Sequence, residues 1–183
     1  EVVYLVFNEG YTATSGERLI RNEICAEALR LGRMLASLTP NDPETLGLAA
    51  LIEIQASRLN ARTGPDGEPV LLLDQDRTRW DQLLIRRGLA YLDRIQQLGG
   101  TAGPYALQAA IAACHARARV APDTDWARIV ALYDGLAQIS PSPVVELNRG
   151  VAAAQAFGPH VGLDIVRPLF EVPSMRGYHL LPA

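Results

Sequence analysis

The sequence predicts an all-α protein of about eight helices, packed as a stack of antiparallel helical hairpins. Three observations lead to this prediction. Apolar residues recur at the helical period through most of the 183 residues. Short turns rich in proline and glycine separate these periodic segments. Aromatic and β-branched residues never alternate over the length of a strand. Consecutive helices joined by short loops pack as antiparallel neighbours, which gives the expected architecture.

Composition and charge exclude several classes of protein. Apolar residues make up 49% and charged residues 20%, which is ordinary for a globular domain. No apolar run approaches the roughly 18 residues needed to cross a bilayer. The net charge of −3 argues against a domain whose main task is to bind nucleic-acid phosphates. Two cysteines are too few for a disulfide scaffold and favour a reducing cytoplasmic compartment.

Helical periodicity organises the first half of the chain. A long amphipathic helix is expected over 17–38, with Leu35 and Leu38 on its buried face. The next helix, over about 43–62, is apolar nearly all round, which is typical of a central helix. The apolar run 70–73 is a lone strand or an extended loop packed on the core. A third long helix is expected over about 77–98.

In the second half of the chain, the residue pattern predicts shorter helices that form a structural repeat. Helices are expected to begin at Pro104, near Asp125, at Pro143 and near Pro159, and Pro168 should kink or end the last one. The elements near Asp125 and Pro159 lie 34 residues apart, which is the tetratricopeptide period. Large residues in the first helix of this unit and small ones in the second fit such a repeat: Trp126, Ile129, Tyr133 and Ala152, Ala153, Ala154. We expect one domain over 1–183, a bundle over 1–100 and a tetratricopeptide-like part over 101–183, belonging to a longer protein.

Two polar groups of residues could carry chemistry. Glu9, beside Asn8, could be an acid or base, or the pair could fix a helix end that Gly10 closes in a left-handed conformation. Asp74 and Asp76 could bind a divalent cation or work as an acid–base pair.

The same stretch also has simpler interpretations. Asp76 or Thr78 is more simply a helix N-cap, and Arg77 and Arg79 then pair with carboxylates on neighbouring helices. Alternatively, Arg77 and Trp80 form a recognition surface, because these residue types dominate contact energetics.

Other candidates are weaker. Asn148 and Arg149 either line the inner groove of a repeat stack, where they would hold a bound peptide, or are satisfied by a neighbouring loop. Cys114 and His115 are adjacent on a helix and point about 100° apart, so they do not form a catalytic pair. Phosphate loops, nucleophile elbows and zinc signatures do not occur in the sequence. We therefore predict no catalytic, metal-binding or cofactor-binding residue.

Five segments together resemble one family: 4–11, 74–81, 103–113, 123–126 and 141–150. Their order and content are similar to the C-terminal, tetratricopeptide-like extension of bacterial extracytoplasmic-function RNA polymerase sigma factors of the sigma-24 type. The resemblance implies promoter-binding regions before residue 1, through which alone the parent protein would contact DNA. It also implies that this extension regulates the sigma factor.

The expected function is therefore a non-enzymatic regulatory domain that binds the sigma promoter-binding regions in cis, the polymerase core, or both, without a membrane. The candidate contact residues are Tyr4, Asn8, Glu9, Tyr11, Asp74, Asp76, Arg77, Trp80, Tyr105, Gln108, Asn148 and Arg149. Two alternatives stay open. The first is a small-molecule or peptide sensor with a pocket lined by Tyr4, Tyr105 and Asn148. The second is an enzyme that uses the carboxylates of Glu9, Asp74 and Asp76.

Overall fold

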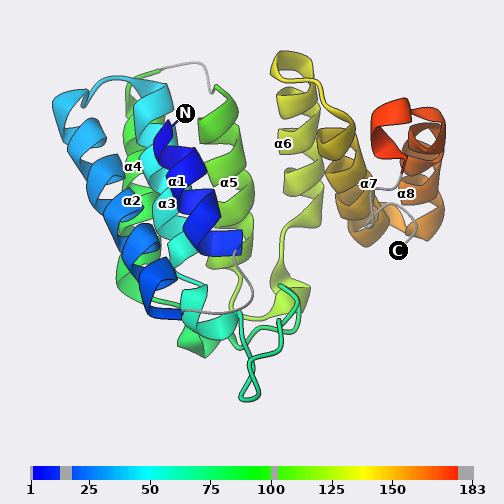
Figure 1. Cartoon of the computed structure of the whole chain (residues 1–183). Helices are drawn as coiled ribbons and strands as arrows, with labels where there is room; N and C mark the ends of the chain where they lie inside the picture. Colours follow the sequence, from blue (N-terminus) through cyan, green and yellow to red (C-terminus); the bar gives the residue numbers. More distant parts are fainter. Residues whose placement is uncertain (1, 13–17, 100–102, 177–183) are drawn as a thin grey trace. The chain divides into compact units, whose positions relative to one another are not determined.

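The protein, represented by a computed structural model, forms two compact units, residues 1–123 and 124–183. The structure describes residues 2–12, 18–99 and 103–176. Within these ranges it contains eight α-helices and no β-strand, which confirms the all-α prediction (Figure 1). The boundary falls after Asp123, whereas the sequence suggested a change of character at residue 100.

Unit 1 is built around one central helix. Its helices are α1 (Val2–Thr12), α2 (Arg18–Leu38), α3 (Pro43–Ala56), α4 (Gln82–Gln97) and α5 (Pro104–Arg117). Helix α3 contacts each of the other four, as its all-round apolar character predicted. Helix α5 packs on α3 and α4, and this packing places it in unit 1. Figure 1 shows α3 enclosed by its neighbours.

Helix α3 begins and packs for simple reasons. Asp42 caps its first turn by accepting hydrogen bonds from the backbone nitrogens of Glu44 and Thr45, and Pro43 occupies the first helical position. Residues 46–54 are all buried. Gly47 allows α5 to approach closely, because a Cβ there would lie 2.5 Å from the backbone nitrogen of Ala106.

Helix α2 buries only part of the face that the sequence predicted. The predicted first residue of this helix, residue 17, lies outside the described ranges. The inward face carries small residues, namely Cys25, Ala28, Gly32 and Ala36, whereas Leu35 and Leu38 are 37% and 71% exposed. The prediction for Leu35 and Leu38 is therefore wrong. Small side chains let α2 lie close to α3, and that close packing outweighs the burial of two leucines.

An ion pair also joins α2 to α3. Arg33 donates to both oxygens of the Glu53 carboxylate, at 2.6 and 3.1 Å, and Glu53 is 1% exposed. A carboxylate so deeply buried needs such a partner, because an unpaired buried charge is costly.

The segment between α3 and α4 is mostly irregular. The predicted helix ends at Ala56 instead of Arg62 and is followed by a 3₁₀ turn, Leu59–Ala61. The run 70–73 belongs to an extended loop; its single bridge in the described residues joins Thr63 to Pro69. We call residues 63–75 the projecting loop, since it extends beyond the helices of unit 1 (Figure 1).

Unit 2 consists of α6 (Trp126–Ile139), α7 (Pro143–Phe157) and α8 (Pro159–Val166), and α7 packs against both others. Small residues bring α7 and α8 together: a Cβ on Gly162 would lie 2.6 Å from the carbonyl oxygen of Gly150. The chain changes from α to 3₁₀ geometry at Arg167–Glu171, where Pro168 was predicted to interrupt the helix.

Candidate interaction site in unit 1

The segment from Asp74 to Asp81 folds as two consecutive caps. Asp76 accepts hydrogen bonds from the backbone nitrogen and hydroxyl of Thr78, at 2.9 and 2.6 Å, and these bonds lower the pKa of Asp76. Asp81 caps α4 by accepting from Leu83 and Leu84. The prediction that Asp76 is an N-cap is thus confirmed, and the carboxylate has a structural role.

These caps turn Arg77 and Trp80 toward the interior. Arg77 is 9% exposed and Trp80 is 3% exposed. The Arg77 guanidinium carbon lies 5.1 Å from the Trp80 ring centroid, within the range of a cation–π contact. The prediction of a recognition surface around these two side chains is therefore wrong, because both are internal parts of unit 1.

Arg77 binds the C-terminal end of α5. Its Nη1 donates to the carbonyl oxygens of His115 and Ala118, at 2.7 and 2.9 Å. The last carbonyls of a helix lack intrahelical partners and carry partial negative charge, so a guanidinium stabilises them well. The sequence predicted a carboxylate partner for Arg77, but these two bonds go to backbone oxygens.

The opposite end of α5 is capped by Glu44, from the first turn of α3. The Glu44 carboxylate accepts hydrogen bonds from the backbone nitrogens of Tyr105 and Ala106, at 3.2 and 3.5 Å. Gly103 leaves room for it, since a Cβ there would collide with this carboxylate. Sequence reasoning missed Glu44. The signal that could have indicated such a cap was the start of α5 at Gly103-Pro104, which has no capping side chain of its own.

Sequence reasoning also missed two further arginines: Arg58, whose charge acts on Arg77, and Arg62, whose charge acts on Arg58. Arg58 donates to the Tyr11 hydroxyl at 3.0 Å and to the Gln55 side chain, and its guanidinium carbon lies 5.9 Å from the Trp80 ring centroid. Arg62 donates to the backbone carbonyl of Tyr11, in the last turn of α1, and stacks 3.6 Å from its ring. We call Arg58, Arg62 and Arg77 the arginine cluster.

The charges of the arginine cluster affect one another, and Asp123 acts in the opposite direction on Arg77. Burial lowers the pKa of Arg58, and the charge of Arg62 lowers it further. Burial and the charge of Arg58 lower the pKa of Arg77. Burial, followed by the charges of Arg58 and Arg77, lowers the pKa of His115 to about 4, so His115 is neutral near pH 7. Excess positive charge in a poorly solvated place favours binding of an anion.

The N-terminal motif contributes to the core of unit 1. Tyr4 meets Tyr105 edge to face, with ring centroids 5.4 Å apart, and its phenol is hydrogen-bonded with Asn8. Gly10 lies inside α1, so its predicted role as a left-handed cap is wrong. Glu9 is exposed.

The remaining candidates are dispersed. Gln108 donates to the Pro104 carbonyl within α5. Arg149 bonds Glu146 and Asp134, which ties α7 to α6. Asn148 is exposed on α7 of unit 2, whereas Tyr4 and Tyr105 belong to unit 1.

The cysteine thiols and the candidate carboxylates differ in burial. Cys25 and Cys114 are buried, as predicted. Asp74 is exposed. In the part of the chain that the structure describes, no group of three or more His, Cys, Asp and Glu residues could hold a metal ion. Across the same residues, no helix combines the length and apolarity required to cross a membrane.

Comparison with known proteins places the chain in a family. An uncharacterized protein of Rhizobium meliloti (strain 1021), R00370, is 47% identical over 177 residues, which are 97% of this chain and 41% of that protein. The chain thus spans less than half the length of this relative. No solved structure matches it. Residues 1–96, just over half of the chain, match the family described as "Family of unknown function (DUF6596)". The chain therefore belongs to the DUF6596 family.

Proposed function

We propose that this chain is the regulatory, C-terminal domain of an extracytoplasmic-function RNA polymerase sigma factor of the sigma-24 type. It acts in the cytoplasm and modulates transcription initiation through protein contacts, without chemistry of its own. The five sequence segments described above support this proposal. The length of the R. meliloti relative also supports it, because 59% of that protein lies outside the match and leaves room for promoter-binding regions.

One observation favours a protein-contact role above the others: the projecting loop exposes two leucines from a firmly anchored base. Leu71 is 73% exposed and Leu73 is 40% exposed. Single exposed apolar residues are common, but these two lie next to the motif segment that begins at Asp74.

The base of the projecting loop is held by several contacts. Leu72 packs on the cluster formed by Ala61, Trp80 and Ile85. The Gln75 side chain donates to the Val70 carbonyl at 3.1 Å, and the Val70 nitrogen donates to the Arg62 carbonyl at 2.8 Å. A preorganised loop loses little conformational entropy when a partner covers its leucines. The proposed partner is the promoter-binding part of the same protein.

The first experiment tests whether the protein is a sigma factor at all. The full-length R. meliloti relative is tagged at its chromosomal locus, purified, and examined for the β and β′ subunits of RNA polymerase. Co-purification of both subunits at stoichiometric level is the expected result. A well-expressed relative that never retains polymerase and supports no transcription with purified core enzyme contradicts the proposal.

The second experiment tests the loop. A full-length protein carrying this chain with Leu71→Ser and Leu73→Ser is compared with Leu38→Ser, because Leu38 is 71% exposed on α2 and serves as a matched control. We expect the loop variant to change output from its target promoter while the control does not. Equal output from both, at equal protein levels, removes the loop from the contact surface.

A sensor function is the second candidate, and the arginine cluster favours it. A ligand changes the activity of such a protein only through different affinities for two conformations. The test is a thermal-shift screen of anionic metabolites against the chain. A ligand that raises the melting temperature and alters promoter output supports this function, and a screen without hits weighs against it.

A further inference from the structure

The ends of three helices meet at one end of unit 1. The backbone nitrogen of Asp81, which caps α4, donates to the carbonyl oxygen of Ser57, the residue after α3, at 2.9 Å. Arg77 joins the same segment to the carbonyl oxygen of Ala118, the residue after α5. The projecting loop, 63–75, lies between α3 and α4 in the chain, so it leaves unit 1 at this end (Figure 1).

The projecting loop is acidic on both sides of its exposed leucines. Its ionisable side chains are those of Asp66, Glu68 and Asp74, all three are exposed, and the loop contains no basic residue. Leu71 and Leu73 lie between Glu68 and Asp74 in the sequence. The loop therefore presents two apolar side chains together with uncompensated negative charge.

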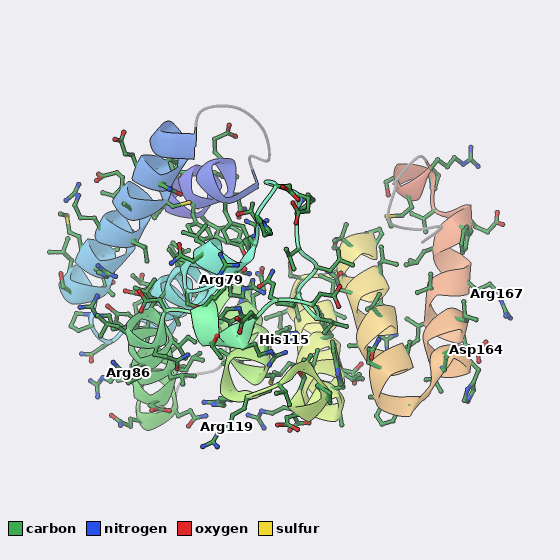
Figure 2. The ribbon with its side chains drawn as sticks, turned by 90° about the horizontal axis from the view of Figure 1, so that it is seen from below. Arg79, Arg86, His115, Arg119, Asp164 and Arg167 are labelled. Carbon is green, nitrogen blue, oxygen red and sulfur yellow. The ribbon has the colours of Figure 1, made fainter. Side chains whose placement is uncertain are left out.

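Four exposed arginines lie at or near the same helix ends. One belongs to the 3₁₀ turn before α4, one to the second turn of α4, one ends α5, and one follows two residues later. Figure 2, a view from below Figure 1, shows three of these side chains, those of Arg79, Arg86 and Arg119. We call the four residues the arginine rim: Arg79, Arg86, Arg117 and Arg119.

The arginine rim also includes exposed apolar side chains nearby. Val120 is 53% exposed and directly follows Arg119. Leu83 is 47% exposed and precedes Arg86 by three residues, a spacing that places both on one side of α4. The rim therefore resembles the projecting loop in its mixture of apolar and charged side chains, but its charge has the opposite sign.

The two sets of charges do not neutralise each other within one chain. Among the described residues, none of the ion pairs includes a carboxylate of the projecting loop or an arginine of the rim. Asp76 and Asp81, the other carboxylates of the adjoining segment, are engaged as caps of the 3₁₀ turn and of α4. Exposed charge of one sign attracts a surface with the complementary charge.

We propose that two copies of this chain associate through this end of unit 1, with the projecting loop of each copy against the arginine rim of the other. A two-fold dimer requires both surfaces at one end of the molecule, because each contact between two different residues then occurs twice. Three carboxylates would face four arginines in each of the two contacts, and Leu71 and Leu73 would be covered.

The inference concerns the chain alone and does not depend on the sigma-factor proposal. If that proposal also holds, the dimer and the contact of the loop with the promoter-binding part exclude each other, because both use Leu71 and Leu73. The dimer is then the state in which the loop is withheld from the promoter-binding part.

Salt dependence is the first test. Exposed ion pairs contribute little individually, so we expect a weak dimer. Charges are screened over about 10 Å at about 0.1 M salt and over about 3 Å at about 1 M. Sedimentation velocity of the complete chain, over a wide range of concentration, should show a monomer–dimer equilibrium at the lower salt concentration. At the higher one, we expect the dissociation constant to rise at least about tenfold.

Charge reversal tests which surfaces meet. The loop variant carries Asp66→Arg and Glu68→Arg, and the rim variant carries Arg86→Glu and Arg119→Glu. Each variant alone should be monomeric, because its loop and rim have the same sign of charge. An equal mixture of the two should form a heterodimer, since both contacts then join opposite charges again. A general effect of charge on association would not produce this recovery.

A matched control and a leucine variant complete the experiment. Glu23→Arg with Asp93→Arg makes the same change of charge at exposed positions of α2 and α4 and should leave the dimer unchanged. Leu71→Ser with Leu73→Ser should weaken the dimer by about tenfold or more, because two apolar side chains are no longer covered. Circular dichroism verifies that each variant is folded.

Three results would overturn the proposal: a chain that stays monomeric at low salt, a dimer that persists in both charge-reversed variants, or a mixture of these variants that does not associate. A monomeric chain whose leucine variant still changes promoter output assigns the loop to the promoter-binding part alone. A dimer without any effect of the loop on promoter output leaves the present proposal standing and counts against the loop contact described under the proposed function.

Discussion

Replacement of Arg77 by methionine offers the sharpest test of how unit 1 is held together. Arg77 connects the segment before α4 to the end of α5 through two hydrogen bonds, at 2.7 and 2.9 Å, and stacks on Trp80. Methionine fills a similar volume with an apolar side chain. The carbonyl oxygens of His115 and Ala118, at the end of α5, then lose their charged hydrogen-bond donor.

The magnitude follows from these contacts. A hydrogen bond to a charged group contributes roughly 1.5–3 kcal/mol, so two would give several kcal/mol. Part of this is offset, because burial and the repulsion by Arg58 already lower the pKa of Arg77 and so oppose its charged form. We expect Arg77→Met to lower the free energy of unfolding by about 2–4 kcal/mol and Arg77→Lys by about half as much, since one ammonium can still reach a carbonyl.

The assay is urea unfolding followed by tryptophan fluorescence. Trp80 and Trp126 are the two tryptophans of the chain, so a Trp126→Phe background makes Trp80 a reporter of unit 1. Arg79→Met is the matched control, because Arg79 lies two residues further along the same 3₁₀ turn and is exposed (Figure 2). If Arg77→Met and Arg79→Met unfold within about 0.5 kcal/mol of each other, the range of ordinary surface substitutions, the proposed capping of α5 by Arg77 is wrong.

Three further predictions concern pH and packing. The pKa of His115 falls from 6.5 to about 4 on folding, so the unfolded chain takes up the proton first as the pH drops from 6.5 to 4. The free energy of unfolding should therefore decrease by up to about 3 kcal/mol over this pH range. Urea unfolding measured across the range should show a smaller decrease for His115→Asn. Glu44→Ala should cost about 1–2 kcal/mol because the N-terminus of α5 loses its cap, and amide hydrogen exchange should accelerate in the first turn of α5 more than in α4. Gly162→Val should lower the melting temperature of unit 2, by an amount equivalent to about 1–3 kcal/mol, because the added side chain overlaps α7 near Ala154; an unchanged circular-dichroism melt would show that the α7–α8 contact is looser than described.

Residue patterns were sufficient to predict most helices and several of their starts, although α3 ends earlier than expected, at Ala56, and α4 begins later than expected, at Gln82. Pro43, Pro104 and Pro143 each stand at the first position of a helix, and Asp76 is a cap. These features are local, since a proline or a capping carboxylate acts within a few residues of its own position. The all-round apolar character of α3 likewise indicated a central helix, because such a helix has no face suited to water.

The candidate site could be predicted only in part. The sequence drew attention to Arg77, Trp80 and Tyr11, all of which belong to unit 1, but one of its interpretations placed Arg77 and Trp80 at an exposed recognition surface. Arg58 and Arg62 attracted no attention because they lie at the end of the predicted helix 43–62, where no motif marks them. Their role depends on Tyr11, which is 47 and 51 residues away in sequence.

The sequence by itself determined the all-α class, the positions of the turns and the buried character of α3, since these depend on periodicity and on the dihedral preferences of single residues. Only the tertiary structure decided which face of α2 is buried, how both ends of α5 are capped and why two arginines meet beside one tryptophan. The physical reason is that close packing and charge compensation depend on groups distant in the chain, whose proximity is fixed only when the helices have docked.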